Sequence, residues 1–140
     1  MNEQVYQKAI KLLSIRQHTT GEMHRKLRQR GFEDQDILPV LRRLEELKFL
    51  DDRRFAEIFV DNLKRYKDWG YFGIKAKLAA RQVPNDIAAA ALAEFFTAED
   101  ELGVAERAVV KLKKQSKTQE QIMRSLASKG FRSEIIRKTL

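Results

Sequence analysis

The chain has 140 residues, no cysteine, and a formal net charge of +8. The absence of cysteine excludes a disulfide framework, a thiolate metal site and a cysteine nucleophile, and no stretch approaches the roughly 18 uninterrupted apolar residues that a membrane span needs. Because the N-terminal residues also lack the charged and apolar regions of a signal peptide, we expect a soluble, cytoplasmic monomer with no membrane partner.

Apolar residues recur every three or four positions along the chain, without lasting strand-like alternation, so we expect an all-α fold. Three similar segments follow one another, and each begins with an amphipathic helix, predicted at about 4–17, 52–67 and 100–114. The residues predicted to face inward are Tyr6, Ala9, Ile10 and Leu13; Phe55, Phe59, Val60 and Leu63; and Leu102, Ala105, Val109 and Leu112.

A second helix in each segment carries a leucine anchor, Leu27, Leu78 or Leu126, with an apolar residue four positions earlier. Thr19 and Thr118 fit the capping box that opens such a helix. Four positions after the anchors the sequence has Gly31, Gln82 and Gly130. Glycine readily adopts the positive φ that ends a helix, and glutamine does so less easily.

The third helix of each segment is predicted to begin at a good N-cap residue and to bury apolar residues three and seven positions later. The N-caps are Asp34, Asn85 and Ser133, and the apolar pairs are Ile37 and Leu41, Ala88 and Leu92, and Ile136 and Leu140. The pattern indicates three tandem three-helix repeats at 1–50, 51–97 and 98–140, stacked into an elongated, curved array. One irregular helical bundle is the alternative.

The sequence offers no catalytic set. Its two histidines, His18 and His24, are six residues apart, which does not place two metal ligands on one helical face, and we expect both to be exposed. Asp51 and Asp52 could share a metal with Glu57, but we prefer to interpret them as the acidic start of a helix, where the dipole favours them. We therefore expect no enzyme, no metal site and no cofactor.

Several stretches of this sequence resemble the RecX family, and together they span almost the whole chain. The middle one is the most specific. The stretches are Leu12-Leu13-Ser14-Ile15-Arg16-Gln17-His18-Thr19 with Glu22, Leu27 and Gly31-Phe32; Phe49-Leu50-Asp51-Asp52-Arg53-Arg54-Phe55-Ala56; Arg65 with Gly70, Ile74 and Leu78; and Gly130-Phe131 with Ile135-Ile136. The sequence departs from the family at Gln82-Val83, where a glycine and an isoleucine are usual, and at Asp68, an acid in a usually basic segment.

The resemblance implies a regulator of the RecA recombinase. RecX-like proteins are understood to bind in the groove of the RecA filament on single-stranded DNA, to touch more than one RecA subunit, and to affect filament growth and the ATPase, strand-exchange and coprotease activities. Negative regulation is the commoner behaviour, so we expect restraint. Whether the chain also touches single-stranded DNA directly is left open. Two alternatives remain, a basic helical protein acting on duplex DNA and a protein-only helical scaffold.

Basic residues outside the apolar stripes are the candidates for contact with RecA or DNA. A cation precedes the turn after each second helix, where it also stabilises the helix dipole. The basic excess is greatest in residues 101–140, with 10 basic and 4 acidic residues, and such clusters bind phosphates, an acidic partner, or only water. The candidates are Arg25, Lys26, Arg28, Arg65, Lys67, Lys75, Lys77, Arg81, Lys113, Lys114, Lys117 and Lys129.

Three aromatic residues, Trp69, Tyr71 and Phe72, lie beside these cations in the sequence. Aromatic side chains next to cations stack on nucleic-acid bases or anchor a protein interface. We prefer the interpretation that they fill the seam between repeats.

Overall fold

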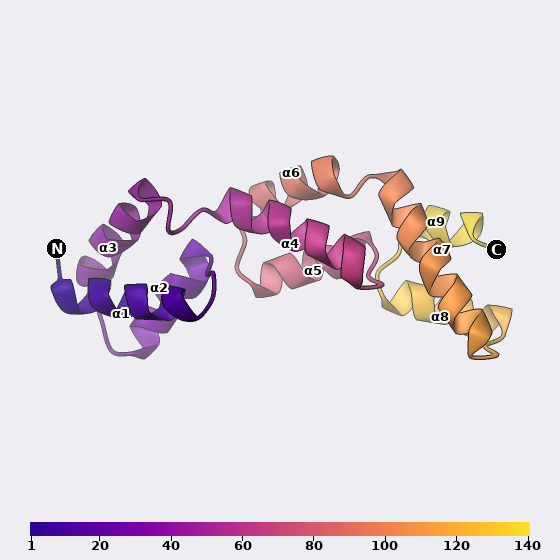
Figure 1. Ribbon diagram of the computed structural model, residues 1–140, viewed down its shortest axis with the longest axis horizontal. Coiled ribbons are helices and arrows are strands. Elements are labelled where there is room, and N and C mark those ends of the chain that lie inside the picture. Colours follow the sequence, from indigo (N-terminus) through magenta and orange to yellow (C-terminus); the bar gives the residue numbers. More distant parts are fainter.

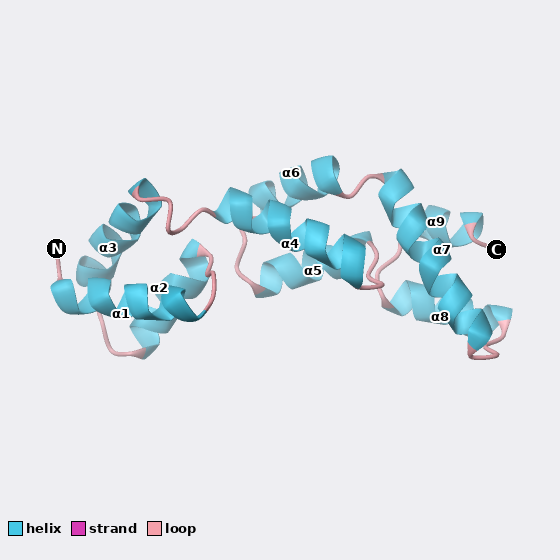
Figure 2. Cartoon of the chain, in the orientation of Figure 1, coloured by secondary structure: helices cyan, strands magenta, loops and turns pink.

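The computed structural model describes residues 1–140 as α-helices joined by short loops, with no strand (Figure 2). Unit 1 comprises α1 (Glu3–Ile15), α2 (Thr20–Gln29) and α3 (Asp34–Glu46). Unit 2 comprises α4 (Asp52–Tyr66), α5 (Tyr71–Ala80) and α6 (Asn85–Phe95), and unit 3 comprises α7 (Ala98–Lys114), α8 (Gln119–Ser128) and α9 (Ser133–Lys138). The units lie in a row with the termini at opposite ends (Figure 1), so the elongated repeat fold is confirmed and the single bundle is excluded.

The leucine anchors occupy equivalent, fully buried places in the three units. Leu27, Leu78 and Leu126 have no exposed surface, and the apolar residues one turn earlier, Met23, Ile74 and Ile122, are buried with them. Side chains four positions apart lie on one face of a helix. Each second helix therefore packs the same apolar ridge against its own unit.

The predicted capping boxes are confirmed at Thr19 and Thr118, whose side chains accept hydrogen bonds from the N3 backbone. The turn after each second helix needs a left-handed residue, and Gly31 and Gly130 supply it with φ of 91° and 82°. Gln82 adopts the same turn with φ of 62°. A non-glycine residue in this conformation costs about 1–2 kcal/mol, which the surrounding packing must offset.

The predicted starts of the third helices are wrong by one residue. Asp34, Asn85 and Ser133 are the first helical residues, and none of the three N-caps before them makes a side-chain capping bond. The Asp34 carboxylate instead binds His24 and Arg28, each at 2.9 Å. Leu140, predicted to be buried, is 46% exposed because α9 ends two residues earlier.

The first helices bury a stripe that is displaced from the predicted one. The closest packing is made by small or slender residues, such as Ala9 in α1, Ala56 and Val60 in α4, and Ala105 in α7. These let the helices approach closely. The bulky residues predicted to face inward are displaced to the edge of the stripe, where they are only partly buried: Tyr6, Ile10, Leu13, Phe55, Phe59, Leu63, Leu102 and Leu112.

The units are not joined in the same way. Units 2 and 3 share one continuous apolar core, which runs from Ala56 in α4 to Ile136 in α9. Unit 1 has a core of its own, which runs from Val5 to Leu50. The joint between units 1 and 2 therefore depends mainly on polar contacts.

A buried carboxylate holds units 2 and 3 together. Glu101 in α7 is fully buried and accepts hydrogen bonds from the backbone N–H groups of Tyr71 (2.9 Å) and Arg132 (3.1 Å) and from Arg132 Nε (2.6 Å). Gly70 N–H donates to the Lys129 carbonyl at 2.9 Å, and a Cβ on Gly73 would overlap that same carbonyl oxygen. The two backbones therefore meet without intervening side chains.

A second polar contact lies at the end of α4. The Asp68 carboxylate accepts from Arg107 Nε at 3.1 Å and from Lys111 Nζ at 2.9 Å, both in α7. Partial burial raises the pKa of Asp68, but the hydrogen bonds and charges of Lys111 and Arg107 outweigh burial and hold the pKa below its usual value. The carboxylate is therefore ionised at neutral pH and links α4 to unit 3.

Replacing the central anchor tests the repeat register. Leu78→Ala should lower the free energy of unfolding by roughly 2–5 kcal/mol, because the substitution opens a cavity at a fully buried position. The measurement is urea unfolding followed by circular dichroism. Ala79→Gly, at an exposed neighbouring position, should cost only about 1 kcal/mol, and equal losses in the two variants would show that Leu78 is not an anchor.

Removing the Asp68 charge should change the acid dependence of stability. Asp68→Asn should lower the free energy of unfolding by about 1 kcal/mol at pH 7, a modest value because the partner cations are partly exposed. Since the folded pKa of Asp68 is depressed, its contribution is present above the unfolded pKa of about 4 and is lost as the pH falls below it.

The difference between wild type and Asp68→Asn should accordingly begin to shrink near pH 4 and keep shrinking as the pH falls through the lower folded pKa of Asp68, measured by urea unfolding at each pH. Glu106→Gln, an exposed α7 position without an ion pair, is the control and should differ from wild type by less than about 0.5 kcal/mol. A difference that stays constant down to pH 3 would contradict the assignment.

Candidate functional site

A groove of about 670 Å³ lies where units 2 and 3 meet, and we call it the Trp69 groove. Its walls come from the end of α4, the α4–α5 loop, the end of α5, and the turn after α8. The lining residues are Phe59, Leu63, Tyr66, Lys67, Asp68, Trp69, Lys77, Ala80, Arg81 and Lys129. Unit 2 supplies nine of these ten residues, and unit 3 completes the groove with Lys129 through the joint described above.

Positive charge in the Trp69 groove is not balanced locally. Lys77 Nζ and Lys129 Nζ lie 4.2 Å and 4.8 Å from the centroid of the Trp69 ring, a favourable cation–π arrangement. Neither lysine forms an ion pair with a carboxylate, and Asp68, the one acid in the lining, is bound by two cations of α7. The groove is therefore suited to a polyanion or another acidic surface.

The structure brings together four of the twelve candidate contact residues, namely Lys67, Lys77, Arg81 and Lys129. The others do not line this groove. Arg25, Lys26 and Arg28 are in α2 of unit 1, Arg65 pairs with Asp61 at 2.9 Å, Lys75 is exposed elsewhere on α5, and Lys113, Lys114 and Lys117 lie around the end of α7. The twelve residues thus form several surfaces rather than one.

The three aromatic residues divide between the seam and the surface. Trp69 and Tyr71 pack against the core shared by units 2 and 3, as preferred from the sequence, and Arg132 lies 4.4 Å from the Tyr71 ring centroid. Phe72 is largely exposed instead. Tyr66, which is not among the candidate residues from the sequence, is 75% exposed at the rim of the Trp69 groove.

A second groove, of about 880 Å³, lies between units 1 and 2, and we call it the Ile58 groove. One face of α4 forms its floor, with walls from the end of α1, the α3–α4 loop and Arg81. The lining residues are Arg16, Gln17, Lys48, Asp51, Arg54, Phe55, Ile58, Phe59, Asn62 and Arg81. It shares Phe59 and Arg81 with the Trp69 groove, so the two grooves adjoin along α4.

Sequence reasoning missed the Ile58 groove because its cations come from separate elements. Arg16, Lys48, Arg54 and Arg81 are spread over 66 positions of the chain. A signal was present in α4, where Phe55, Ile58, Phe59 and Asn62 follow helical spacing. Phe55 and Phe59 are predicted to face inward but are only partly buried, whereas Ile58 and Asn62 are not assigned to the core from the sequence.

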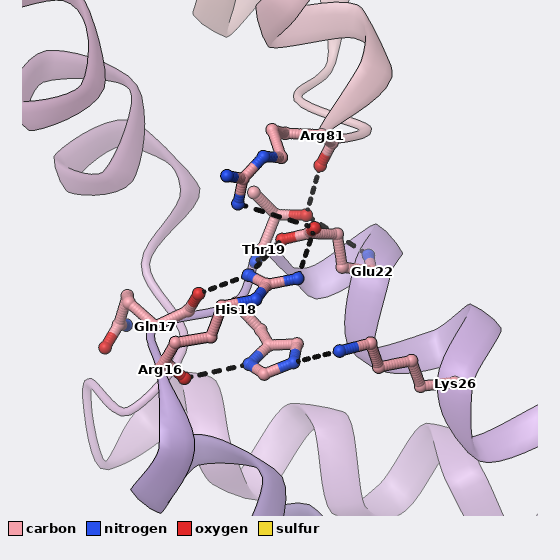
Figure 3. Close-up of polar contacts among 7 residues, drawn as sticks. All are labelled: Arg16, Gln17, His18, Thr19, Glu22, Lys26 and Arg81. Atoms are coloured by element: carbon pink, nitrogen blue, oxygen red, sulfur yellow. Dashed lines mark hydrogen bonds and ion pairs between the residues drawn. The ribbon is translucent and has the colours of Figure 1, made fainter.

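A buried glutamate organises the joint beneath the Ile58 groove (Figure 3). Glu22 accepts from the Thr19 backbone at 3.1 Å and from Arg16 at 2.9 and 3.3 Å, and Arg81 of unit 2 lies 3.8 Å away. Burial raises the pKa of Glu22, but the hydrogen bonds from Arg16 and Thr19 and the charges of Arg16 and Arg81 outweigh it, so the pKa falls below its usual value. One carboxylate therefore holds two arginines at the wall.

Backbone and side-chain contacts fix the same joint across the two units. Thr19 Oγ1 donates to the Arg81 carbonyl at 2.6 Å, and Thr20 N–H donates to Asp52 at 2.8 Å. With its amide nitrogen donating to the Gly21 carbonyl, Gln82 accepts from Arg25 at 2.8 Å. The candidate residue Arg25 therefore contacts unit 2.

The prediction that both histidines are exposed is wrong for His18, which is buried in this joint (Figure 3). Its Nδ1 lies 2.9 Å from the Arg16 carbonyl, which can only accept, so Nδ1 carries the proton and Nε2 accepts from Lys26 Nζ at 2.8 Å. Burial lowers the pKa of His18, and the bond to Arg16 opposes this only in part. His18 is thus a neutral structural residue that orients Lys26.

The carboxylates near the start of α4 act as predicted for a helix start. Asp51 accepts from the Arg54 backbone at 3.1 Å, and Asp52 accepts from Thr20 of unit 1. No cluster of three or more histidine, aspartate or glutamate side chains is placed to bind a metal ion. No helix is both long and apolar enough to traverse a membrane.

Comparison with known proteins identifies the family. Residues 6–44 match the first three-helix domain of RecX, and residues 51–92 match the second. The regulatory protein RecX of Prosthecochloris aestuarii is 37% identical over 134 residues, covering 95% of this chain and 89% of that protein. The RecX of Chlorobium phaeobacteroides is 31% identical over 140 residues, covering 99% of this chain and 93% of that protein.

The fold comparison extends the likeness over the third unit. The crystal structure of RecX from Lactobacillus salivarius superposes with a TM-score of 0.89 and 26% sequence identity, covering 97% of this chain and 92% of that one. The chain therefore belongs to the RecX family, a family of regulatory proteins rather than enzymes.

Proposed function

We propose that this protein is a negative regulator of the RecA recombinase. It binds in the groove of the RecA filament on single-stranded DNA and restrains filament growth together with the filament's ATPase, strand-exchange and coprotease activities. It acts as a monomer in the cytoplasm and needs no cofactor. Membership of the RecX family supports the regulatory part of this proposal.

The observation that carries the proposal is the Trp69 groove. Lys77 and Lys129, from different units, face it without carboxylate partners. Unpaired cations over a shared aromatic ring favour contact with phosphates or with an acidic surface. A filament on DNA presents both along its helical groove.

The elongated shape supports a bridging mode of action. The three units lie in a row, so contacts at separate units can engage neighbouring filament subunits at once. Linked contacts of this kind raise overall affinity well above that of each contact alone. A protein bound across several subunits opposes the changes that accompany growth and turnover, and this accounts for restraint without any catalytic group.

Reversing the groove charges should weaken regulation. Lys77→Glu/Lys129→Glu should reduce inhibition of RecA ATPase on single-stranded DNA by at least about tenfold in the concentration required, because each lost charge contact is typically worth about 1 kcal/mol or more. The measurement is steady-state ATP hydrolysis by RecA titrated with each variant. Circular dichroism checks that helix content is retained.

The matched control is Arg42→Glu/Arg124→Glu, which makes the same charge change at exposed positions of α3 and α8 outside both grooves. The concentration that it requires for inhibition should lie within about threefold of the wild-type value, because only the long-range electrostatic attraction changes. Equal loss in the two variants would show that total charge, not the Trp69 groove, governs binding. Wild-type protein that leaves RecA ATPase unchanged would overturn the proposed function.

Binding assays with the purified wild-type protein distinguish the two alternative functions. A protein acting on duplex DNA should bind a naked duplex with a steep salt dependence and leave RecA unaffected. A protein-only scaffold should bind no DNA and leave the filament unchanged.

A further inference from the structure

We propose that the Ile58 groove is a protein-binding site for an acidic amphipathic segment, which seats an apolar side chain against Ile58 and places carboxylates beside Arg54 and Lys48. This inference rests on the proposed function, because the natural source of the segment is the RecA protein of the filament. The groove's chemistry, however, is argued from this chain alone.

The floor of the groove is apolar and has no partner within the chain. Ile58 is 50% exposed in the middle of α4, between Phe55 and Phe59, which are only partly buried. These side chains and Asn62 are spaced three and four residues apart, so they form one stripe along the helix. A cavity of about 880 Å³ above such a stripe is large enough to hold several side chains of a docked segment.

The walls of the groove are positively charged. Four cations, Arg16, Lys48, Arg54 and Arg81, face a lining whose only carboxylate is Asp51. Asp51 caps α4, and Glu22 beneath the wall is shared by Arg16 and Arg81. Arg54 and Lys48 form no ion pair, so their charges are available to an incoming acid.

The aromatic residues of this groove are poorly placed for nucleic-acid bases. The Phe55 and Phe59 rings stack on each other, with centroids 5.6 Å apart and planes inclined by 17°. The Arg81 guanidinium covers them at 6.0 Å and 5.4 Å from the centroids. Base stacking needs an open ring face, whereas ring edges and an exposed isoleucine suit an apolar protein side chain. Protein is therefore the favoured occupant.

The arrangement joins two kinds of recognition. Because Phe59 and Arg81 line both grooves, a segment in the Ile58 groove lies next to a polyanion in the Trp69 groove. Each contact alone is exposed and modest. Occupation of both by one protein–nucleic-acid complex gives the linked binding that discriminates the complex from its separate components.

The first test uses Ile58→Asp, which places a carboxylate on the apolar floor opposite the proposed acidic segment. It should weaken binding to RecA assembled on a fluorescent oligo-dT by at least tenfold and leave binding to naked oligo-dT within twofold of wild type. Val110→Asp, at a similarly exposed position (52%) of α7 outside both grooves, is the control and should match wild type in both assays. Unchanged filament binding by Ile58→Asp, or an equal loss on naked DNA, would overturn the proposal.

The second test does not depend on RecA. A synthetic helical peptide with leucine and glutamate at three- and four-residue spacing should shift the Ile58 methyl resonances of the full chain, and the same peptide with lysine for glutamate should not. Arg54→Glu should reduce the response at least fivefold, with Arg42→Glu as the charge control. If the wild-type chain does not bind RecA filaments but still responds to the acidic peptide, the result would contradict the proposed function and support the groove assignment. The groove assignment would be contradicted by equal responses to the two peptides or by no response to either. It would also be contradicted if a second copy of this chain already occupies the groove.

Discussion

The molecule depends on buried carboxylates that dock each unit onto the next. Glu101 accepts hydrogen bonds from the backbone N–H groups at the starts of α5 and α9. At the other joint, Asp52 accepts from Thr20, and Glu22 binds Arg16 and Arg81. A buried carboxylate left without donors is strongly unfavourable. Glu101 takes one of its three hydrogen bonds from Tyr71 of unit 2. Glu22 is bonded within unit 1 and adds an ion pair to Arg81, and the half-buried Asp52 adds a bond to Thr20. Small three-helix units, whose separate cores are limited, thereby become one array.

The joints also help to form the two grooves for which we propose a function. Docking brings the cation at the end of a second helix, Arg81 or Lys129, against the preceding unit. Lys129 reaches Trp69 of unit 2 in this way, and Arg81 reaches Glu22 of unit 1. Each groove is completed by a second unit, through Lys129 in the Trp69 groove and through Arg16, Gln17 and Lys48 in the Ile58 groove. Repeat packing and binding chemistry are therefore consequences of the same contacts.

The repeated framework was predictable from sequence because it depends on short-range spacing. Anchors such as Leu78, capping boxes and left-handed turns recur at fixed intervals and need no knowledge of the joints. Much of what failed depends on contacts between separate segments of the chain. His18 was expected at the surface because nothing local shows that Lys26 and the Arg16 carbonyl enclose it. The Ile58 groove was missed because distant segments assemble it, and eight of the twelve candidate cations proved to lie outside the Trp69 groove.

In the binding mode that we propose, the two adjoining grooves form one surface that contacts protein and nucleic acid together. The most direct measurement is a cryo-electron microscopy reconstruction of this protein bound to RecA on single-stranded DNA. We expect Ile58 and Arg54 to lie against a RecA segment and Lys77 and Lys129 to face the nucleoprotein groove, with Arg81 between them. A complex docked through the opposite face, with both grooves open to solvent, would contradict it.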